Sequence, residues 1–292
     1  MTDKKYNIEL KTVCKSYDDK LILDHINLAV REGEFCTVIG PSGCGKSTLL
    51  RLILGQEQAS SGLVSVNGKP VERPGPERGI VYQKYSLFPN LTVLENATLG
   101  LRLRKSYIHQ LRNKGEHDEE AMEYLTRAKL DKHANKYPYE LSGGMRQRAA
   151  IIQALIMKPD ILLMDEPFGA LDPQTREDMQ LFVLELWEQL GMTVFFVTHD
   201  LEEALYLGTR CFVLSQYYTD DREEVDWNRR GAKIVADHHL TNQVASSKIK
   251  ESAEFIQLMQ QIRQDGFDPA YLQHVEDFNL KHPDSHKVIV KD

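Results

Sequence analysis

Hydrophobic and polar positions alternate along the first thirty residues of the chain. This pattern predicts short strands over residues 6–30, with a turn at the polar cluster Asp18-Asp19-Lys20. The apolar run Phe35-Cys36-Thr37-Val38-Ile39 comes next, and Gly40 follows it. A compact run rich in β-branched residues predicts a buried strand that leads into a loop.

Helix and strand patterns alternate along most of the remaining chain. Residues 47–54 predict a helix that ends at Gly55. Further strands are expected at residues 63–66, 79–82, 161–164 and 193–198. Strands that alternate with helices at this spacing indicate a parallel α/β sheet.

Between the early and the late strands lies a segment with helix formers, many charges and few β-branched residues, at about residues 90–158. We expect this segment to be helical. Its last helix is predicted to begin after Ser142 and to end at Lys158, because Pro159 follows.

Two later helices carry clear start signals. Asp172 is a capping residue with Pro173 at the first helical position, and Gly191 is predicted to end that helix. Asp200 is predicted to cap the next helix, with Glu203 placed to return a bond to the capping residue.

Residues 219–292 form a tail that differs in character from the rest. Its charged stretch Asp220–Arg230 predicts a loop or an insertion, and two helices are expected, over 251–264 and after Asp268-Pro269. The apolar residues of these helices are Phe255, Leu258, Met259 and Ile262 in the first, and Leu272, Val275 and Phe278 in the second. Because an apolar stripe must be covered, we expect the first helix to pack on its own chain or on a second copy.

Composition narrows the class of protein. The 292 residues include 36 basic and 43 acidic ones, and the net charge of −7 argues against a general affinity for nucleic acid. No apolar run approaches the ~20 residues that span a bilayer, and the polar N-terminus predicts no secretory signal. The four cysteines form no CxxC pair, which indicates a reduced, cytoplasmic compartment.

Histidines in the tail lack metal-ligand spacing with nearby carboxylates or thiols, so we expect them to be solvated and to bind no metal. They are His238, His239, His274, His282 and His286.

The segment Gly40-Pro-Ser-Gly-Cys-Gly-Lys-Ser47 matches the pattern G-x-x-x-x-G-K-[ST], with a predicted strand before it and a predicted helix after it. Backbone N–H groups of such a loop surround phosphate oxygens, and the helix N-terminus adds positive potential. Lys46 can reach the β- and γ-phosphates of ATP, and the Ser47 hydroxyl can ligate Mg²⁺. The candidate ATP-binding residues of this loop are Gly40, Pro41, Ser42, Gly43, Cys44, Gly45, Lys46, Ser47 and Thr48.

Cys44 lies inside this loop. The helix N-terminus and Lys46 are both expected to lower the pKa of its thiol, so that it reacts faster than Cys36 and is protected by ATP. The alternative is that the Cys44 side chain points into the core and is merely tolerated there.

A nucleoside-triphosphate site also needs a carboxylate for its metal. Asp165 ends the predicted strand 161–164 and is the candidate ligand. Glu166 comes next and could orient and deprotonate an attacking water. The alternative reading of Asp-Glu-Pro is an ordinary exit from a strand into a loop.

The segment Leu141-Ser-Gly-Gly-Met145 resembles the signature sequence of ATP-binding cassette (ABC) ATPases, although many members of the family have Gln at its last position. Within the family, the string Leu-Ser-Gly-Gly-Met-Arg-Gln-Arg is most similar to ATPases of importers for nitrate, sulfonates and taurine. Other motifs occur in the family's order across residues 6–216. They are the adenine-stacking aromatic at Tyr17, the Q-loop glutamine at Gln83, the strand with its carboxylates at Ile161–Pro167, the D-loop at Ala170-Leu171-Asp172 and the switch histidine at His199.

The resemblance implies an α/β fold: a P-loop NTPase core of the RecA type, an N-terminal antiparallel β subdomain, and an inserted α-helical subdomain that carries the signature sequence. It implies an ATPase domain over residues 1–240, with the helical subdomain at about 90–158. Residues 231–235 resemble the strand after the last core helix of the family. Residues 241–292 are then a C-terminal helical extension.

The resemblance also implies a mechanism that needs two copies, because ATP binds between the subunits of a head-to-tail homodimer. Glu166 is the general base, His199 contacts the γ-phosphate, and Gln83 links the Mg²⁺ or the water to a membrane partner. The implied catalytic residues are Glu166, His199, Lys46 and Gln83; the implied Mg²⁺ ligands are Ser47, Gln83 and Asp165; and the residues that contact ATP of the opposite subunit are Ser142, Gly143, Gly144 and Asp172.

Implied partners are a transmembrane permease and, indirectly, a solute-binding protein, with the ATPase at the cytoplasmic face of the membrane. The solute is expected to be a small nitrate-, sulfonate- or taurine-like molecule or another small nitrogen- or sulfur-containing one. Residues 84–101 are the candidate groove for the permease, and its apolar residues are Leu87, Phe88, Leu91 and Leu94. The alternative is that these four residues pack the helical subdomain onto the core.

Two other functions are weighed against the importer. A soluble ABC ATPase acting on ribosomes or DNA usually carries two cassettes in one chain or long coiled coils, and the sequence has neither feature. A P-loop kinase or GTPase outside the family is disfavoured by the Leu-Ser-Gly-Gly segment and by the paired Asp165 and Glu166. Alone, Gln83 would be a surface residue, Tyr17 a half-buried strand aromatic and His199 a capping or core residue.

Overall fold

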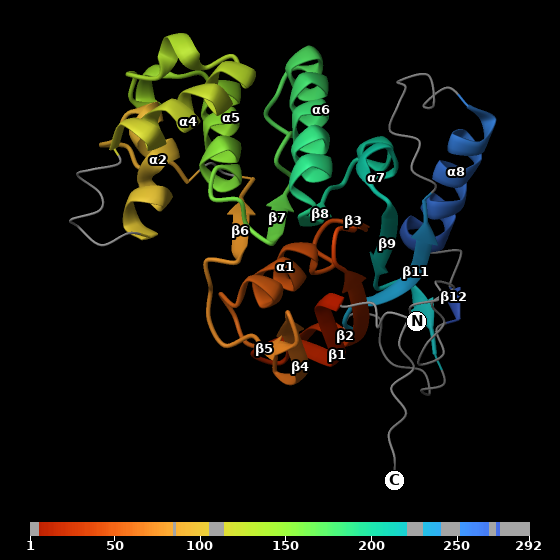
Figure 1. Cartoon of the computed structure of the whole chain (residues 1–292). Coiled ribbons are helices and arrows are strands. Elements are labelled where there is room, and N and C mark those ends of the chain that lie inside the picture. Colours follow the sequence, from red (N-terminus) through yellow and green to blue (C-terminus); the bar gives the residue numbers. More distant parts are fainter. Residues whose placement is uncertain are drawn as a thin grey trace, which may run out of the picture. The chain divides into compact units, whose positions relative to one another are not determined.

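The computed structural model describes residues 6–83, 86–104, 114–220, 230–240, 252–268 and 273–274. The chain divides into two compact units, the first formed by Met1–Gly75 with Thr193–Asp292 and the second by Pro76–Met192 (Figure 1).

The first unit begins with an antiparallel sheet of four strands in the order β2-β1-β4-β5. Their bounds are Tyr6–Tyr17 for β1, Lys20–Arg31 for β2, Ser61–Val66 for β4 and Lys69–Pro70 for β5. The predicted turn between β1 and β2 is confirmed, and Asp18 adopts a left-handed conformation there, with φ 48°. The alternation seen in the sequence therefore corresponds to a sheet with one buried face.

The same unit holds a core sheet in which β3 (Phe35–Ile39) lies between β8 (Thr193–Val197) and β9 (Arg210–Ser215), parallel to both. The last strand, β11 (Lys233–His239), pairs antiparallel with β9. All five residues of β3 are buried, as expected for an apolar strand with a layer on each face. Helix α1 (Lys46–Leu54) follows β3 and ends at Gly55, as predicted.

Helix α7 (Leu201–Leu207) begins at Asp200, whose side chain accepts bonds from the amides of Glu202 and Glu203. The predicted direct bond between the Glu203 side chain and the capping residue Asp200 is wrong. The Asp200 amide donates to the Thr198 hydroxyl (3.1 Å), and that hydroxyl donates to Glu203 Oε2 (2.6 Å). Thr198 thus relays the bond that a capping box makes directly.

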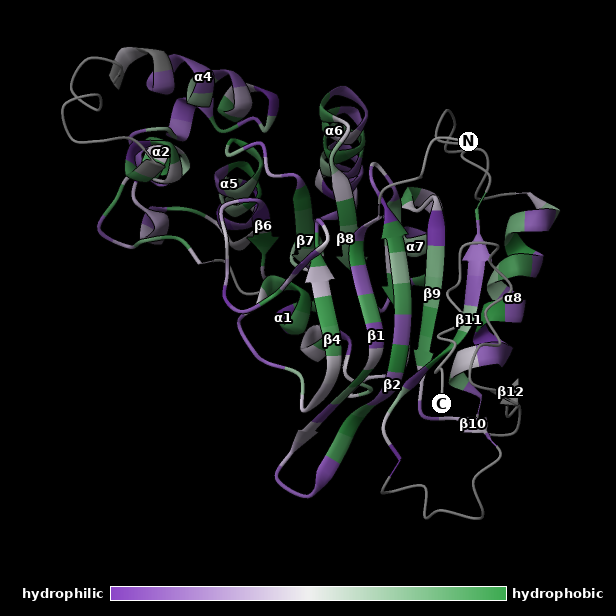
Figure 2. Ribbon diagram, turned by 60° about the horizontal axis from the view of Figure 1, so that its bottom comes forward, coloured by the Kyte–Doolittle hydropathy of each residue, from purple (hydrophilic) through white to green (hydrophobic). Residues whose placement is uncertain are grey.

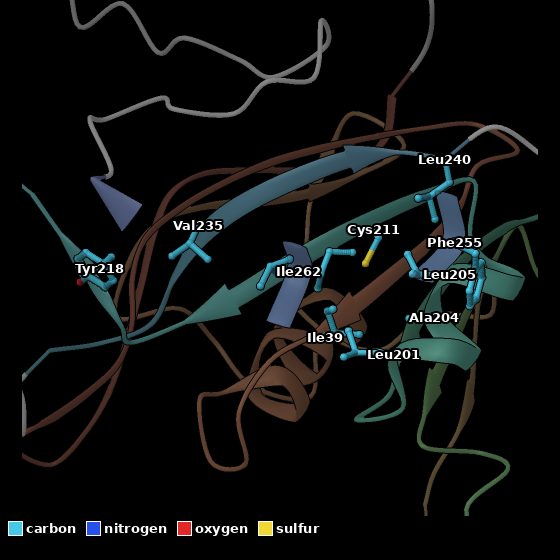
Figure 3. Packing of buried hydrophobic residues seen from close by; sticks show 11 residues of the cluster. Ile39, Leu201, Ala204, Leu205, Cys211, Tyr218, Val235, Leu240, Phe255 and Ile262 are labelled. Atoms are coloured by element: carbon cyan, nitrogen blue, oxygen red, sulfur yellow. The ribbon is translucent and has the colours of Figure 1, made fainter. Parts of the chain in front are cut away.

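Helix α8 (Ala253–Phe267) confirms the predicted tail helix, which extends three residues beyond 264. It alternates hydrophobic and hydrophilic residues along its length (Figure 2). Phe255 and Ile262 are buried in a cluster with residues of β9, β11 and α7, as Figure 3 shows. The Ser215 hydroxyl donates to the Gly266 carbonyl at 2.7 Å, so the helix packs on the core of its own chain.

Two other expectations for the tail are corrected. Gln273 and His274 form a short strand, β12, parallel to β10 (Tyr218–Thr219), and not part of a helix. The rest of the expected second helix, with Leu272, Val275 and Phe278, lies outside the described residues. His238 is not solvated, because its ring is mostly buried and lies 3.5 Å from the Asp265 carboxylate. His282 and His286 also lie outside the described residues.

The second unit contains a pair of parallel strands and most of the helices. Strand β6 (Arg78–Val81) pairs with β7 (Ile161–Asp165). The helices are α2 (Val93–Arg104), α4 (Lys114–Arg127), α5 (Gly143–Leu155) and α6 (Pro173–Leu190), with short 3₁₀ turns at Asp131–His133 and Pro138–Glu140. Asp172 caps α6 and Gly191 ends it, as predicted.

The predicted end of α5 at Lys158 is wrong, because the helix ends at Leu155. Lys158 is left-handed, with φ 46°, and its amide donates to the Leu155 carbonyl at 2.9 Å. Contact with the proline ring disfavours the helical conformation in the preceding residue, and here the helix ends three residues before Lys158. Among the described residues, no helix is both long and apolar enough to cross a membrane.

Candidate functional site

The predicted phosphate-binding loop connects β3 to α1 in the first unit, in the expected order of strand, loop and helix. A Cβ atom at Gly40 would lie 1.9 Å from the Leu214 carbonyl oxygen, and Gly45 has φ 103° with Ile22 and Leu23 side chains closing around it. Both positions therefore require glycine. Gly45 is the N-cap of α1 and makes no side-chain cap bond, and the N-terminus of such a helix favours an anion.

Lys46 opens α1 and is only 8% exposed. Its ammonium donates to the carbonyls of Gly40 (2.8 Å) and Pro41 (3.0 Å), which hold the charge against the inner side of the loop. Thr48 is buried and Ser47 half-buried, while Ser42 and Gly43 on the rim are exposed. A loop with a fixed cation inside and exposed residues at its rim suits an incoming phosphate chain.

Cys44 is the one residue of this loop for which the structure overturns the predicted chemistry. Its side chain is 2% exposed, in the region where Gly40 packs. Burial raises the pKa of the Cys44 thiol, although Lys46 acts in the opposite direction. Desolvation outweighs the nearby charge because a buried thiolate loses its hydration, so the core-packing alternative is correct.

Tyr17, the expected adenine-stacking residue, ends β1 and is 39% exposed. Its hydroxyl donates to Glu57, and the Lys15 ammonium lies 4.8 Å from its ring centroid. Partial burial tends to raise the pKa of Glu57, but bonds from Tyr17, Lys15 and Arg51 outweigh it and lower the pKa. The ring is thus fixed at its hydroxyl and along one face, by a glutamate that sequence analysis did not single out.

In the second unit, Asp165 is the last residue of β7 and Glu166 follows it. Glu166 adopts a left-handed conformation, with φ 46°, which is uncommon for a residue with a long side chain. The Gln83 side-chain amide donates to Glu166 Oε2 at 2.8 Å. Two residues predicted separately, as the Q-loop glutamine and the general base, are therefore in direct contact.

The signature segment forms the start of α5. The Ser142 hydroxyl accepts a bond from the Met145 amide at 3.3 Å and so caps the helix. No atom lies within 4 Å of a Cβ built on Gly143, whereas one built on Gly144 would lie 3.3 Å from Leu171 Cδ2. Gly143 therefore faces open space, and Gly144 packs on the neighbouring D-loop segment.

Asp172, the last of the residues expected to act on the partner's ATP, is exposed and caps α6 by accepting from the Thr175 amide at 3.0 Å. The bonds from Thr175 lower the pKa of its carboxyl. His199, the predicted switch histidine, is exposed and directly follows Thr198 after β8 in the first unit. Both residues are thus at positions that a second molecule can reach.

The candidate permease groove has features of both alternatives, a surface for the permease and packing within the chain. Phe88 is 52% exposed, while Leu87, Leu91 and Leu94 are half-buried. The buried Asn96, which the sequence did not reveal, accepts from the Phe88 amide at 2.7 Å and donates to the carbonyls of Phe88 and Leu91. This amide holds the turn that presents Phe88.

The expected Mg²⁺ ligands fit that ion in their chemistry. Ser47 offers a hydroxyl, Asp165 a carboxylate and Gln83 an amide oxygen, since the Gln83 nitrogen already donates to Glu166. Oxygen donors of these kinds are those that Mg²⁺ prefers when it also binds phosphate.

Comparison with known proteins finds relatives over most of the chain. The family model described as "ABC transporter" matches residues 23–169. The chain is 43% identical to "Taurine import ATP-binding protein TauB" of Rhizobium johnstonii over 82% of this chain and 87% of the relative. It is 41% identical to "Nitrate import ATP-binding protein NrtD" of Synechocystis over 82% of this chain and 86% of the relative. Other relatives of similar identity are spermidine/putrescine import proteins.

Among solved structures, the fold matches a dimeric ATP-binding cassette, MJ0796, in a post-hydrolysis state bound to ADP and Pi. The TM-score is 0.66 at 31% identity, and the match covers 80% of this chain and 99% of the other.

Proposed function

The chain belongs to the ABC transporter family, and we propose that it is the energy-coupling subunit of an importer for a small solute of the taurine or nitrate kind. Its activity as an ABC ATPase, with ATP hydrolysis coupled to transport, follows from the family. Similarity to relatives named for taurine and nitrate import supports the solute class. The contact between Gln83 and Glu166 supports the coupling, because it joins a candidate base to a candidate sensor of the membrane partner.

We assign ATP binding to the phosphate loop. Amides at the start of α1 and the buried Lys46 ammonium neutralise the β- and γ-phosphates. Tyr17 stacks on the adenine with the ring face that Lys15 does not cover. Mg²⁺, when bound to Ser47, Asp165 and Gln83, offsets the charge of the phosphates.

Hydrolysis then requires a positioned base. Glu166 accepts the proton of the attacking water while Gln83 holds its Oε2 atom. The water oxygen bonds to the γ-phosphorus, the bond from that phosphorus to the β–γ bridging oxygen breaks, and ADP leaves. His199 donates to a γ-phosphate oxygen, where negative charge accumulates.

The remaining site residues act on a second copy of the chain. Ser142, Gly143, Gly144 and Asp172 bind no nucleotide of their own in this proposal; they contact ATP held by the opposite subunit. Support comes from the open space at Gly143 and from the amides at the start of α5. ATP thereby holds a head-to-tail homodimer together, and hydrolysis releases it.

A mixing experiment tests this sharing of sites. Lys46→Ala removes the phosphate ligand, and Gly143→Glu places a carboxylate in open space, where it repels a partner's phosphate without disturbing its own fold. We expect each variant to be inactive alone and the mixture to recover about a quarter of wild-type activity, because half of the dimers then keep one intact site. A mixture that neither hydrolyses ATP nor forms ATP-dependent dimers would contradict the proposal.

For the permease, Phe88 is the proposed contact at the cytoplasmic face of the membrane, and a solute-binding protein delivers the solute to the permease. Phe88→Ala should leave the ATPase rate of the isolated subunit unchanged and abolish its stimulation by the permease. Affinity purification of the full-length chain from its own membranes should recover that permease. Recovery of ribosomal proteins instead would favour the alternative function.

The solute class is tested on the purified complex in vesicles. Either taurine or nitrate, with the cognate receptor, should stimulate ATP hydrolysis if the assignment is right. Stimulation by spermidine alone would keep the importer and overturn the solute.

A further inference from the structure

We propose that Cys14, Asp24 and His25 form a zinc-binding site on the antiparallel sheet of the first unit, built from residues that the nucleotide chemistry does not use. One sulfur, one oxygen and one nitrogen donor all lie within 4.8 Å of one another. The Cys14 Sγ atom is 3.6 Å from Nδ1 of His25, and Oδ1 of Asp24 is 2.7 Å from the same nitrogen. A thiol and a carboxylate thus face one ring nitrogen.

The backbone brings these donors together through a β-bulge. The pairing shifts between Val13 and Lys15 of β1, so that Asp24 and His25 of β2 both lie opposite Cys14. Successive strand residues normally point to opposite faces of a sheet. His25 departs from this rule with a left-handed φ of 47°, and its side chain reaches that of its neighbour. Bulges and backbone outliers of this kind gather at functional positions.

The two spacings that involve His25 suit a tetrahedral ion with little rearrangement. Zinc bonds of about 2.0–2.3 Å place neighbouring donor atoms roughly 3.4–3.6 Å apart. The distance between Cys14 and His25 already has this value. The His25 nitrogen must move from Asp24 by roughly 0.7 Å, and it can, because the His25 side chain is 55% exposed while that of Asp24 is 1% exposed.

Contacts behind the donors hold Asp24 in place. The Tyr218 hydroxyl lies 3.0 Å from Asp24 Oδ2, the oxygen that faces away from His25. The Asp24 amide donates to the Ala232 carbonyl at 2.9 Å. Metal-binding carboxylates are characteristically supported in this way. Three protein donors leave a fourth position for water.

The donor set selects the ion. Sulfur and nitrogen donors favour zinc over Mg²⁺, which takes oxygen. On binding, the Cys14 thiol loses its proton, and the His25 ring keeps a single proton on Nε2, with zinc at Nδ1. Thiolate and carboxylate together balance the two charges of the ion. Because protons are released, binding should weaken as the pH falls.

Alkylation of the full-length protein tests the site directly. Of the four cysteines, all in described residues, Cys14 is partly exposed and the other three are buried, so iodoacetamide reports on Cys14. We expect micromolar Zn²⁺ to slow labelling of Cys14 at least tenfold, as measured by peptide mass spectrometry, and millimolar Mg²⁺ to leave it unchanged. Labelling that zinc does not slow would overturn the proposal.

Variants complete the test with Co²⁺ as a spectroscopic probe. The wild type should show thiolate-to-cobalt charge-transfer absorption, and Cys14→Ser should lose it. His25→Gln should weaken Zn²⁺ binding by more than about 100-fold, and Tyr218→Phe by about tenfold, since support residues matter less than ligands. The control His239→Gln removes an exposed histidine and should bind like wild type. Equal affinity in His25→Gln and wild type would show adventitious binding and refute the site.

Discussion

Two helix starts, that of α1 in the first unit and that of α5 in the second, present backbone amides in different ways. The cap of α1 is Gly45, which makes no side-chain bond, and the buried Lys46 follows it. The cap of α5 is Ser142, whose hydroxyl binds the Met145 amide. Neither first turn carries an acidic residue, so both can accept an anion.

The difference indicates that the starts of α1 and α5 have separate roles. A helix start without a side-chain cap and with a buried cation favours an anion. A start whose serine cap already accepts from one amide should bind an anion more weakly. We therefore expect α1 to determine affinity for ATP, and α5 to matter only after a second copy delivers its nucleotide.

The largest effect is expected from Glu166→Gln. This variant should reduce ATP hydrolysis while leaving the starts of α1 and α5 unchanged. Loss of a positioned base should slow ATP hydrolysis by about 10²–10⁴-fold. ATP affinity should stay within twofold, and ATP-bound dimers should accumulate in size-exclusion chromatography. The control is Glu188→Gln on the exposed face of α6. Near-normal turnover in Glu166→Gln would remove this residue from the role of base.

Lys46→Ala tests whether the start of α1 determines the affinity for ATP. A hydrogen bond to a charged group is worth about 1.5–3 kcal/mol, so ATP affinity should fall roughly 10–100-fold and ATP-driven dimers should disappear. Equilibrium binding with a fluorescent ATP analogue measures the change, and Lys69→Ala, in the exposed strand β5, is the control. ATP-dependent dimers of normal stability in Lys46→Ala would contradict the phosphate-loop assignment.

Ser142→Ala should reveal the weaker role of α5. Each cap is worth about 1 kcal/mol, and we expect the ATPase rate to fall about tenfold while binding of ATP to the monomer is unchanged. Ser252→Ala is the matched control, because Ser252 caps α8 in the same way, accepting from the Phe255 amide. If both variants lose the same activity, the effect of Ser142 is structural.

Substitutions in the tail helix α8 should change the stability of the protein without changing its nucleotide chemistry. Ile262→Ala removes a fully buried side chain, and large-to-small changes of this kind cost about 2–5 kcal/mol. We expect the melting temperature to fall by roughly 5–15 °C with ATP affinity unchanged. Ile256→Ala, on the exposed side of the same helix, should change the melting temperature by less than about 2 °C. Equal melting temperatures for the two variants would refute the packing.

The smallest effect concerns Cys44. Because burial raises the pKa of its thiol, the reactive thiolate is scarce at neutral pH and increases only as the pH rises through that raised value. Cys44 should therefore be alkylated more slowly than Cys14 at pH 7.5, with the rate rising toward alkaline pH. Fast labelling of Cys44 at pH 7.5 would instead support the sequence-based prediction of a reactive Cys44 thiol.

Local rules explain what could be predicted from the sequence. The strand Phe35–Ile39, the helix that ends at Gly55 and the cap at Asp172 depend on neighbours within a few residues, and these were confirmed. Motifs with fixed spacing likewise placed the phosphate loop and the signature segment correctly on their elements.

Contacts between distant segments could not be predicted in the same way. Gln83 and Glu166 are 83 residues apart, and their bond depends on the pairing of β6 with β7. The Cys14 cluster depends on a bulge, which alternation alone does not reveal. Cys44 shows a third reason, since charge favoured a low pKa and only the packing showed that desolvation dominates.

The left-handed backbone at Glu166 limits which replacements the position can accept. Asp and Asn adopt such a conformation more readily than Glu, so a shorter side chain would relax the main chain there. It would also withdraw the carboxylate by one methylene from Gln83, whose amide now lies 2.8 Å away. A designer who wishes to raise the stability of this protein at residue 166 would therefore shorten the reach of the proposed base. Backbone conformation and side-chain length cannot both be optimised at this one residue.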